Sequence, residues 1–347
     1  MVLFRKYAII LVIALLLALP FFSYQAKAQV TIEKISSFNH QMFVNDYGFI
    51  LVNETIFIKN DLESPATLPL INITYPQELY NKIIPQVISP NNFNFNIALT
   101  ENHTRLTIDS RGYEIQPNGS VTISVKFYLV KIFSPAGDLN YSAPIPLVPA
   151  LSLPIKQVNS SLSIPSFVIF ASQHKNFTAI QTDYFTWELI GAFSNVTQGF
   201  SRTENVTISV LEVENYYFAL LEFTEAKREL ILSPLGDIRV RDTITMINYD
   251  NRSVSKLKPS PLTNDFKSII IIPPLTNPFF NPLSDANNRQ VDLGANLTKG
   301  ERYTVTLEYP IRSLDVIKAK DGLFELSLPL KTPIDGVVYN YTVKVIL

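Results

Sequence analysis

The segment Val121-Thr-Ile-Ser-Val-Lys-Phe-Tyr-Leu129 alternates apolar and polar residues without a break. Successive side chains of a β-strand point to opposite faces, so this order places all the apolar residues on one face. The residues that fill the segment are largely β-branched or aromatic, which suits a pleated surface. The segment therefore predicts a half-buried strand. The same alternation recurs in 205–213, 238–246, 302–309 and 339–345.

Turn-forming residues separate these segments, because Pro and Gly provide the backbone angles that tight turns need. The clearest examples are 116–119, 233–237, 248–251 and 319–322. Many short strands at this spacing are typical of β-sandwiches, and a chain of 347 residues is long enough for two domains. We therefore expect an all-β fold with two tandem β-sandwich domains, residues 30–214 and residues 215–347, after an N-terminal signal segment.

Two segments are expected to depart from the strand pattern. Residues 76–84 predict a short helix, with Pro76 at its first position and Leu79 and Ile83 on one face. Residues 134–165 contain six prolines. Since proline cannot donate a backbone hydrogen bond, we expect this segment to be an extended crossing within the first domain and not a central strand.

Composition excludes several classes of function. Lys and Arg number 29 against 30 Asp and Glu, which leaves a formal net charge of -1. A balance this even provides no long-range field to attract nucleic acid. The chain has no cysteine, which rules out disulfides, a thiol nucleophile and thiolate-bound metals. No cofactor motif is present, and we expect neither a cofactor nor a metal.

The first 28 residues have the three parts of a secretory signal: basic Arg5 and Lys6, an uncharged apolar stretch over 7–22, and Ala26-Lys-Ala28 as a cleavage site. The apolar stretch is shorter than the ~20 residues that span a bilayer comfortably. A cleaved signal peptide is favoured over an uncleaved anchor. In either case the rest of the chain is expected to be extracytoplasmic.

The sequon Asn-x-Ser/Thr is present at twelve positions, more than composition explains, which indicates an exported glycoprotein. Many sequons without cysteine suit an archaeal cell exterior. The alternative is that strands rich in Asn and Thr produce sequons by composition alone. The glycosylation candidates are Asn53, Asn72, Asn102, Asn118, Asn140, Asn159, Asn176, Asn195, Asn205, Asn251, Asn296 and Asn340.

No catalytic motif is recognisable. The three histidines, His40, His103 and His174, lack metal-ligand spacing and are expected to be solvated loop residues. A glycosidase would need two carboxylates facing each other across a cleft, which spacing cannot show. Asp285 and Asp292 match no calcium-loop spacing. The carboxylates that gather along the chain are Glu212, Glu214, Glu222, Glu225, Asp237 and Asp242.

Two residues invite a choice between structure and function. Asp242 lies on the face of its predicted strand that otherwise carries apolar residues. A local bulge or a buried, hydrogen-bonded carboxylate is favoured there over a site residue. Trp187 is the only tryptophan, and an anchor in a core or an interface is favoured over a platform for sugar.

The segment Glu229-Leu-Ile-Leu-Ser-Pro-Leu-Gly-Asp-Ile-Arg-Val-Arg-Asp-Thr243 resembles the start of the second lumenal domain in the ribophorin I family. The shared features are an apolar strand, a Ser-x-x-Gly turn and a second strand with an acidic residue. Four further segments resemble the family in the same order, so that the similarity covers most of residues 30–347. They are 71–80, 141–146, 265–274 and 341–347.

Ribophorin I is a non-catalytic subunit of the eukaryotic oligosaccharyltransferase complex. The resemblance implies a non-catalytic, extracytoplasmic accessory subunit that assists protein N-glycosylation by binding partners or substrate. It implies an oligosaccharyltransferase-like membrane protein complex as partner. The family continues beyond this point to a membrane helix, whereas this sequence stops at Leu347. No catalytic residue is carried over, because the chemistry belongs to another subunit.

Two other functions are kept open. The chain can be a structural or adhesive surface-layer glycoprotein with cell-surface proteins as partners, which tandem copies or arrays would favour. It can also be a secreted carbohydrate-active enzyme, the least favoured hypothesis, which a cleft with two facing carboxylates would support.

Overall fold

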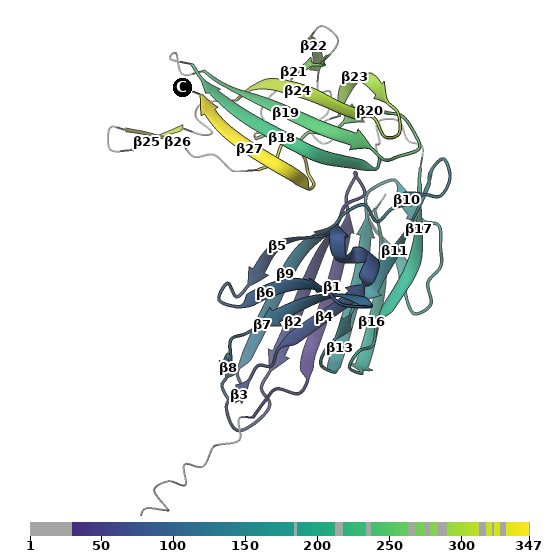
Figure 1. Ribbon diagram of the computed structural model, residues 1–347, viewed down its shortest axis with the longest axis vertical. Helices are drawn as coiled ribbons and strands as arrows, with labels where there is room; N and C mark the ends of the chain where they lie inside the picture. The colour runs from purple at the N-terminus through teal and green to yellow at the C-terminus, as the bar shows by residue number, and fades with distance from the viewer. Residues whose placement is uncertain are drawn as a thin grey trace, which may run out of the picture.

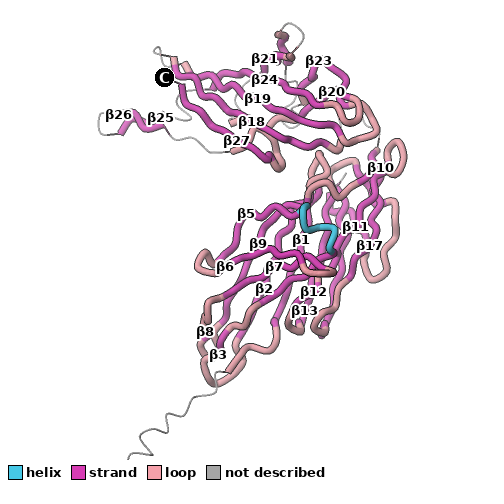
Figure 2. Tube along the Cα trace, viewed as in Figure 1, coloured by secondary structure: helices cyan, strands magenta, loops and turns pink. Residues whose placement is uncertain are grey.

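The computed structural model describes residues 30–183, 186–211, 218–233, 237–262, 268–274, 278–282, 290–311, 317–320, 323–326 and 331–346. The described part of the chain is mostly β, in several mainly antiparallel sheets that form two sandwich domains (Figures 1 and 2), which confirms the predicted fold class. Among the described residues, no helix has the length and apolar character needed to cross a bilayer.

The first domain packs a seven-stranded sheet, in the order β15-β16-β13-β1-β2-β9-β5, against two four-stranded sheets (Figure 1). Those two sheets have the orders β10-β11-β17-β14 and β12-β4-β7-β6, and β3 pairs with β8. The strands of the domain are β1 (Ile35–Val44), β2 (Ile50–Lys59), β3 (Ala66–Thr67), β4 (Ile71–Pro76), β5 (Ile83–Ser89), β6 (Asn94–Leu99), β7 (His103–Asp109), β8 (Glu114–Ile115), β9 (Ser120–Leu129), β10 (Ser134–Pro135), β11 (Asn140–Val148), β12 (Ala150–Leu151), β13 (Ile155–Ile164), β14 (Val168–Phe170), β15 (Thr178–Asp183), β16 (Thr186–Val196) and β17 (Arg202–Val210).

The second domain is built on a six-stranded sheet with the order β22-β21-β24-β19-β18-β27. Two pairs, β20 with β23 and β25 with β26, complete it. Each domain has its own hydrophobic core. The strands are β18 (Leu221–Leu232), β19 (Ile238–Asn248), β20 (Val254–Leu257), β21 (Ser268–Ile272), β22 (Phe279–Pro282), β23 (Val291–Leu297), β24 (Arg302–Ile311), β25 (Ile317–Lys320), β26 (Leu323–Leu326) and β27 (Val338–Ile346).

The two large sheets share one topology. In the first domain, β13-β1-β2-β9-β5 follow each other across the sheet, with β13 parallel to β1 and the other pairs antiparallel. In the second, β27-β18-β19-β24-β21 follow each other in the same way, with β27 parallel to β18. In both sheets, the order in which the chain forms the strands at these five positions is also the same. The domains therefore repeat one architectural unit.

The domains are joined by a turn of the first that enters the core of the second. Tyr47 and Phe49, in the turn between β1 and β2, are buried and belong to the second hydrophobic core. The Tyr47 ring meets Phe223 edge to face, with ring centroids 5.0 Å apart. The Tyr47 hydroxyl donates to the Lys258 carbonyl at 2.8 Å, and Lys258 Nζ pairs with Asp46 at 2.8 Å. This turn fixes the domains together through both apolar and polar contacts.

A buried polar cluster forms a second connection. Tyr141 of β11 donates from its hydroxyl to Asp250 Oδ2, in the turn after β19, at 2.6 Å. Arg252 donates to the same hydroxyl and to the Phe218 carbonyl, and its guanidinium lies 5.5 Å from the centre of the Tyr141 ring. Burial, with Asp250 beside it, raises the pKa of Tyr141 well above its usual range, so the hydroxyl stays protonated and donates.

Replacing Tyr141 with phenylalanine is expected to lower the free energy of unfolding by about 1–3 kcal/mol, because buried Asp250 loses a hydrogen-bond donor. Urea denaturation of the full chain measures the loss. Tyr113→Phe serves as a matched control, since the Tyr113 side chain is exposed and a change within about 0.5 kcal/mol is expected there. Equal effects of the two substitutions would contradict the proposed role of the cluster.

The five strands predicted by alternation are present as β9, β17, β19, β24 and β27. The strand predicted over 205–213 is β17, which begins earlier and ends at Val210. The predicted helix is a 3₁₀ helix, η1 (Gln77–Lys82), with Leu79 buried, whereas Ile83 already belongs to β5. Pro76 ends β4 and also caps this helix. The six residues of this 3₁₀ helix carry the chain from β4 in one sheet to β5 in the other.

The prediction for residues 134–165 is wrong. The segment contains β11, with Pro144 and Pro146 inside it, and β13, which lies in the middle of the seven-stranded sheet. Pro154 and Pro165 flank β13 without entering it. In β11, the neighbour β10 pairs only with residues 141 and 142, so the two prolines lie where that side of the strand has no partner in β10.

Two predictions lie outside the described residues. The signal peptide over 1–28 falls before the first described residue, and the domain boundary at 214 and 215 falls in a gap between described ranges. Both stay predictions.

Candidate functional site on the outer face of the first domain

The outward side chains of β1, β2 and β13 are mostly polar and uncharged, apart from Lys59 and Lys156, which both pair with Asp61. Their inward neighbours, such as Phe38 and Val52, are buried in the core, so strand alternation turns the polar residues outward. Asn159 Nδ2 donates to Asn39 Oδ1 at 2.9 Å across the paired strands β13 and β1. Other outward residues of these three strands are the polar Ser37, Asn39, Gln41, Asn53, Thr55, Gln157, Asn159, Ser161 and Ser163 and the apolar Phe43, Leu51 and Phe57.

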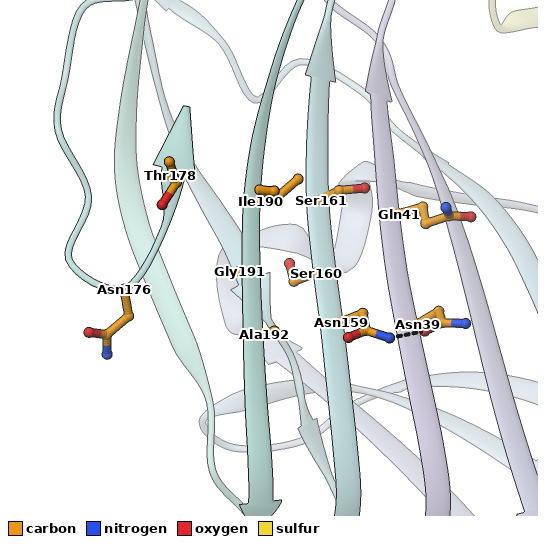
Figure 3. Close-up of a pocket in the computed structure, with 10 residues that line it drawn as sticks. All are labelled: Asn39, Gln41, Asn159, Ser160, Ser161, Asn176, Thr178, Ile190, Gly191 and Ala192. Carbon is orange, nitrogen blue, oxygen red and sulfur yellow. Dashed lines mark hydrogen bonds between the residues drawn. The ribbon is translucent and has the colours of Figure 1, made fainter. Parts of the chain in front are cut away.

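A cavity of about 560 Å³ lies on this surface (Figure 3). Ile190, Gly191 and Ala192 of β16 form a small apolar wall, and none of the described residues that line the cavity has a charged side chain. The Asn53 Oδ1 atom, on the same face, is buried and accepts no hydrogen bond from the described residues. The polar side chains that line the cavity are Asn39, Gln41, Asn159, Ser161, Asn176 and Thr178.

Asn176, in the loop between β14 and β15, and Thr178, the first residue of β15, both line the cavity. Phe177, between them, is buried and packs against Phe193 of β16, with ring centroids 5.6 Å apart. A Cβ atom at Gly191 would come within 2.6 Å of the Phe177 ring. Gly191 thus leaves the space in which Phe177 anchors the loop, which the sequence pattern did not reveal.

The same loop is held from behind by Ser172, His174 and Glu204. Ser172 Oγ lies 2.7 Å from His174 Nε2, and His174 Nδ1 lies 3.6 Å from Glu204 Oε2. The order resembles a hydrolytic triad, but Ser172 Oγ also accepts the Thr207 backbone N–H at 3.0 Å, and 3.6 Å is too long for a hydrogen bond from imidazole to carboxylate. The group therefore ties the loop to β17 and does not present a free nucleophile.

His174 is buried, so its prediction as a solvated histidine is wrong. The Arg202 side chain hydrogen-bonds Glu204 and holds the pKa of that carboxyl below its usual range. His103 is exposed, as expected, but it is the first residue of strand β7 and not a loop residue.

His40 is also buried, and its prediction is wrong for the same reason: the imidazole has partners inside the protein. His40 Nδ1 lies 2.8 Å from Glu54 Oε1, and Nε2 lies 2.8 Å from the Pro146 carbonyl oxygen. The Tyr75 hydroxyl donates to the same Glu54 oxygen. Neither His40 nor Glu54 reaches the surface, so this group supports the fold.

Asp242 is a buried, hydrogen-bonded carboxylate, one of the two structural explanations that its position among apolar residues favours. Arg228 Nε and Nη2 donate to its two oxygens at 2.7 and 2.8 Å, and the Tyr309 hydroxyl donates at 2.9 Å. Burial alone would lower the pKa of the Arg228 guanidinium, but the bonds to Asp242 outweigh it and raise that pKa. Arg228 and Asp242 face each other on β18 and β19, as His40 and Glu54 do on β1 and β2.

The other predicted carboxylates do not converge where they are described. Glu222 is buried and pairs with Lys131, Glu225 lies 3.7 Å from Arg302, and Asp237 is exposed. Asp292 is exposed and accepts the Gly294 N–H at 2.7 Å. Glu212, Glu214 and Asp285 lie outside the described residues. In the described part of the chain, no three Asp, Glu or His side chains gather as metal ligands would.

Trp187 is half-buried on β16 and packs against the core of the first domain. The twelve sequon asparagines are all accessible: nine are exposed, and Asn53, Asn72 and Asn140 are half-buried. By contrast, the fully buried Asn60 and Asn248 are not in sequons, and their amides donate to backbone carbonyls inside the protein. The sequons thus lie where a glycan has room.

Comparison with known proteins finds no family model and no curated protein that matches this chain. Among solved structures, one that matches is the crystal structure of a "putative protease" from Parabacteroides distasonis. It is 11% identical, with a TM-score of 0.27, and the match covers 51% of this chain and 40% of that one. A similarity this low bears on neither the fold nor the function.

Proposed function

We propose that this protein is an extracytoplasmic, non-catalytic accessory subunit of a protein N-glycosylation complex, similar to ribophorin I. Such a subunit holds its partners or its substrate and leaves the glycosyl transfer to another protein. Oligosaccharyltransferase-like membrane proteins are the expected partners.

The observation that carries the proposal is where the ribophorin-like segments lie. Residues 71–80 form β4 and most of η1, a strand followed by a helical turn, as in the family pattern. Residues 229–243 include the end of β18 and the first half of β19, with acidic Asp242 inside β19. Tyr141 opens the 141–146 segment and contacts the second domain through Asp250. The similar segments are thus framework strands of both domains and part of their junction.

The expected result is that affinity-tagged full-length protein, purified from solubilised membranes of its own organism, brings down the catalytic subunit of an oligosaccharyltransferase. We expect enrichment of about tenfold or more over a tagged exported protein of equal abundance, which corresponds to about 1.4 kcal/mol of preferential binding. Mass spectrometry of the crosslinked complex measures it. Recovery of no glycosylation component would overturn the proposal.

A second candidate is a structural or adhesive surface-layer glycoprotein, which the accessible sequons on both domains favour. In that case the same purification would yield other copies of this chain or other surface proteins in an ordered array.

A further inference from the structure

We propose that the cavity on the outer face of the first domain binds a neutral oligosaccharide. Its walls supply amide and hydroxyl groups, which both donate and accept hydrogen bonds, as the hydroxyls of a sugar do. Ile190 remains 37% exposed beside them and offers apolar surface to the C–H face of a sugar ring. The volume of about 560 Å³ is within the usual range for ligand sites.

The second domain shows that the fold itself does not require this surface. The corresponding outward positions are found by aligning the two units so that the pair His40–Glu54 matches the pair Arg228–Asp242. Asn39 and Gln41 then correspond to Lys227 and Glu229, which form an ion pair. Asn53 corresponds to Arg241, which pairs with Glu308. At these three positions, one copy of the unit therefore has ion-paired side chains and the other has uncharged amides, although Lys126 of β9 lies opposite Asn53.

The position of the cavity favours a sugar over a peptide. Extended peptides gain most of their affinity by pairing their backbone with an open strand edge. The strands β1 and β13 lie inside the sheet, and both of their edges are already paired. Of the strands that line the cavity, only β15, which contributes Thr178, is at the edge of the sheet. A ligand on β1 and β13 is therefore held by side chains, through donors and acceptors that carry no charge.

The oligosaccharide has two sources in principle. Asn159 and Asn176 both line the cavity and both belong to sequons, so a glycan attached to either could lie in it. A glycosylated asparagine retains one N–H, which in Asn159 could still donate to Asn39. The other source is a separate glycan. If the ligand is a separate glycan, the inference rests on the proposed function, which supplies its biological setting. The binding itself requires no partner protein.

The test uses full-length protein made in a host without N-glycosylation, titrated by calorimetry with mannotriose and with N,N′-diacetylchitobiose. The variant Asn39→Lys/Gln41→Glu places the residues of the second domain in the cavity and is expected to weaken binding about tenfold or more, since desolvated charges replace matched hydrogen bonds. The reciprocal variant Lys227→Asn/Glu229→Gln is the control and should bind as the unmodified sequence does.

Native glycoprotein separates the two sources. If its own glycan fills the cavity, added oligosaccharide binds only after enzymatic deglycosylation or in Asn159→Gln/Asn176→Gln; if the ligand is separate, native protein binds directly. Absence of binding to unglycosylated protein, equal binding by Asn39→Lys/Gln41→Glu, or binding of an uncharged Asn/Ser/Thr peptide in place of the sugars would each overturn the inference. Binding with no co-purified glycosylation subunit would retain it and reject the accessory role.

Discussion

Replacing Asp242 with asparagine is expected to lower the free energy of unfolding of the second domain by about 3–5 kcal/mol. The substitution keeps the shape of the side chain but removes its charge. Arg228 and Asp242 are each 1% exposed, so the guanidinium would be left without its counter-ion in the interior. Removing one partner of a buried ion pair costs far more than the pair itself contributes, because water cannot reach the remaining charge.

The measurement is denaturant unfolding followed by a probe in the second domain. Asp237→Asn is a matched control in the same strand region, since Asp237 is exposed, and it should change stability by no more than about 0.5 kcal/mol. The double variant Arg228→Met/Asp242→Leu should recover to within about 2 kcal/mol of the original protein, because it leaves no charge unpaired. Equal losses in Asp242→Asn and Asp237→Asn would refute this account of the pair.

The fold class could be read from the sequence because strand alternation is a local property. Segments such as 121–129 and 302–309 record burial directly in the order of their residues. Asp242 could be recognised as unusual for the same reason, since it interrupts the apolar residues on one face of its strand. Its partner could not be recognised, because Arg228 joins it only through the pairing of β18 with β19.

The cavity was beyond sequence analysis for a related reason. Asn39 and Asn159 are 120 residues apart and meet only because β1 and β13 pair in parallel. The residues around Glu54 give no sign that its side chain is buried, apart from its position on the apolar face of its strand. His40 is predicted to be a loop residue because a lone histidine is usually solvated. The prediction for 134–165 assumed that proline is excluded from central strands. That exclusion applies to strand positions with hydrogen-bonded partners on both sides, whereas Pro144 and Pro146 are not paired with β10.

Replacing His40 with leucine is the second substitution for which we expect a large effect, about 3–5 kcal/mol in the first domain. The imidazole lies between Glu54 and the Pro146 carbonyl, at 2.8 Å from each. Leucine fills similar space but leaves the Glu54 carboxylate with only the Tyr75 hydroxyl, and it removes the imidazole donor from the Pro146 carbonyl. Because His40 and Glu54 occupy the same strands of the repeated unit as Arg228 and Asp242, the two domains should respond alike.

Thermal and urea unfolding, with a probe in the first domain, measure this loss. His103→Leu is the control, since His103 is exposed and should change stability by no more than about 0.5 kcal/mol. In the double variant His40→Leu/Glu54→Leu, no unpaired carboxylate remains, so much of the stability should return even though Tyr75 and Pro146 lose their partners. If the double variant were less stable than His40→Leu alone, packing of the Glu54 side chain and not its pairing with the imidazole would account for the stability of this site, and the parallel between the two domains would not hold.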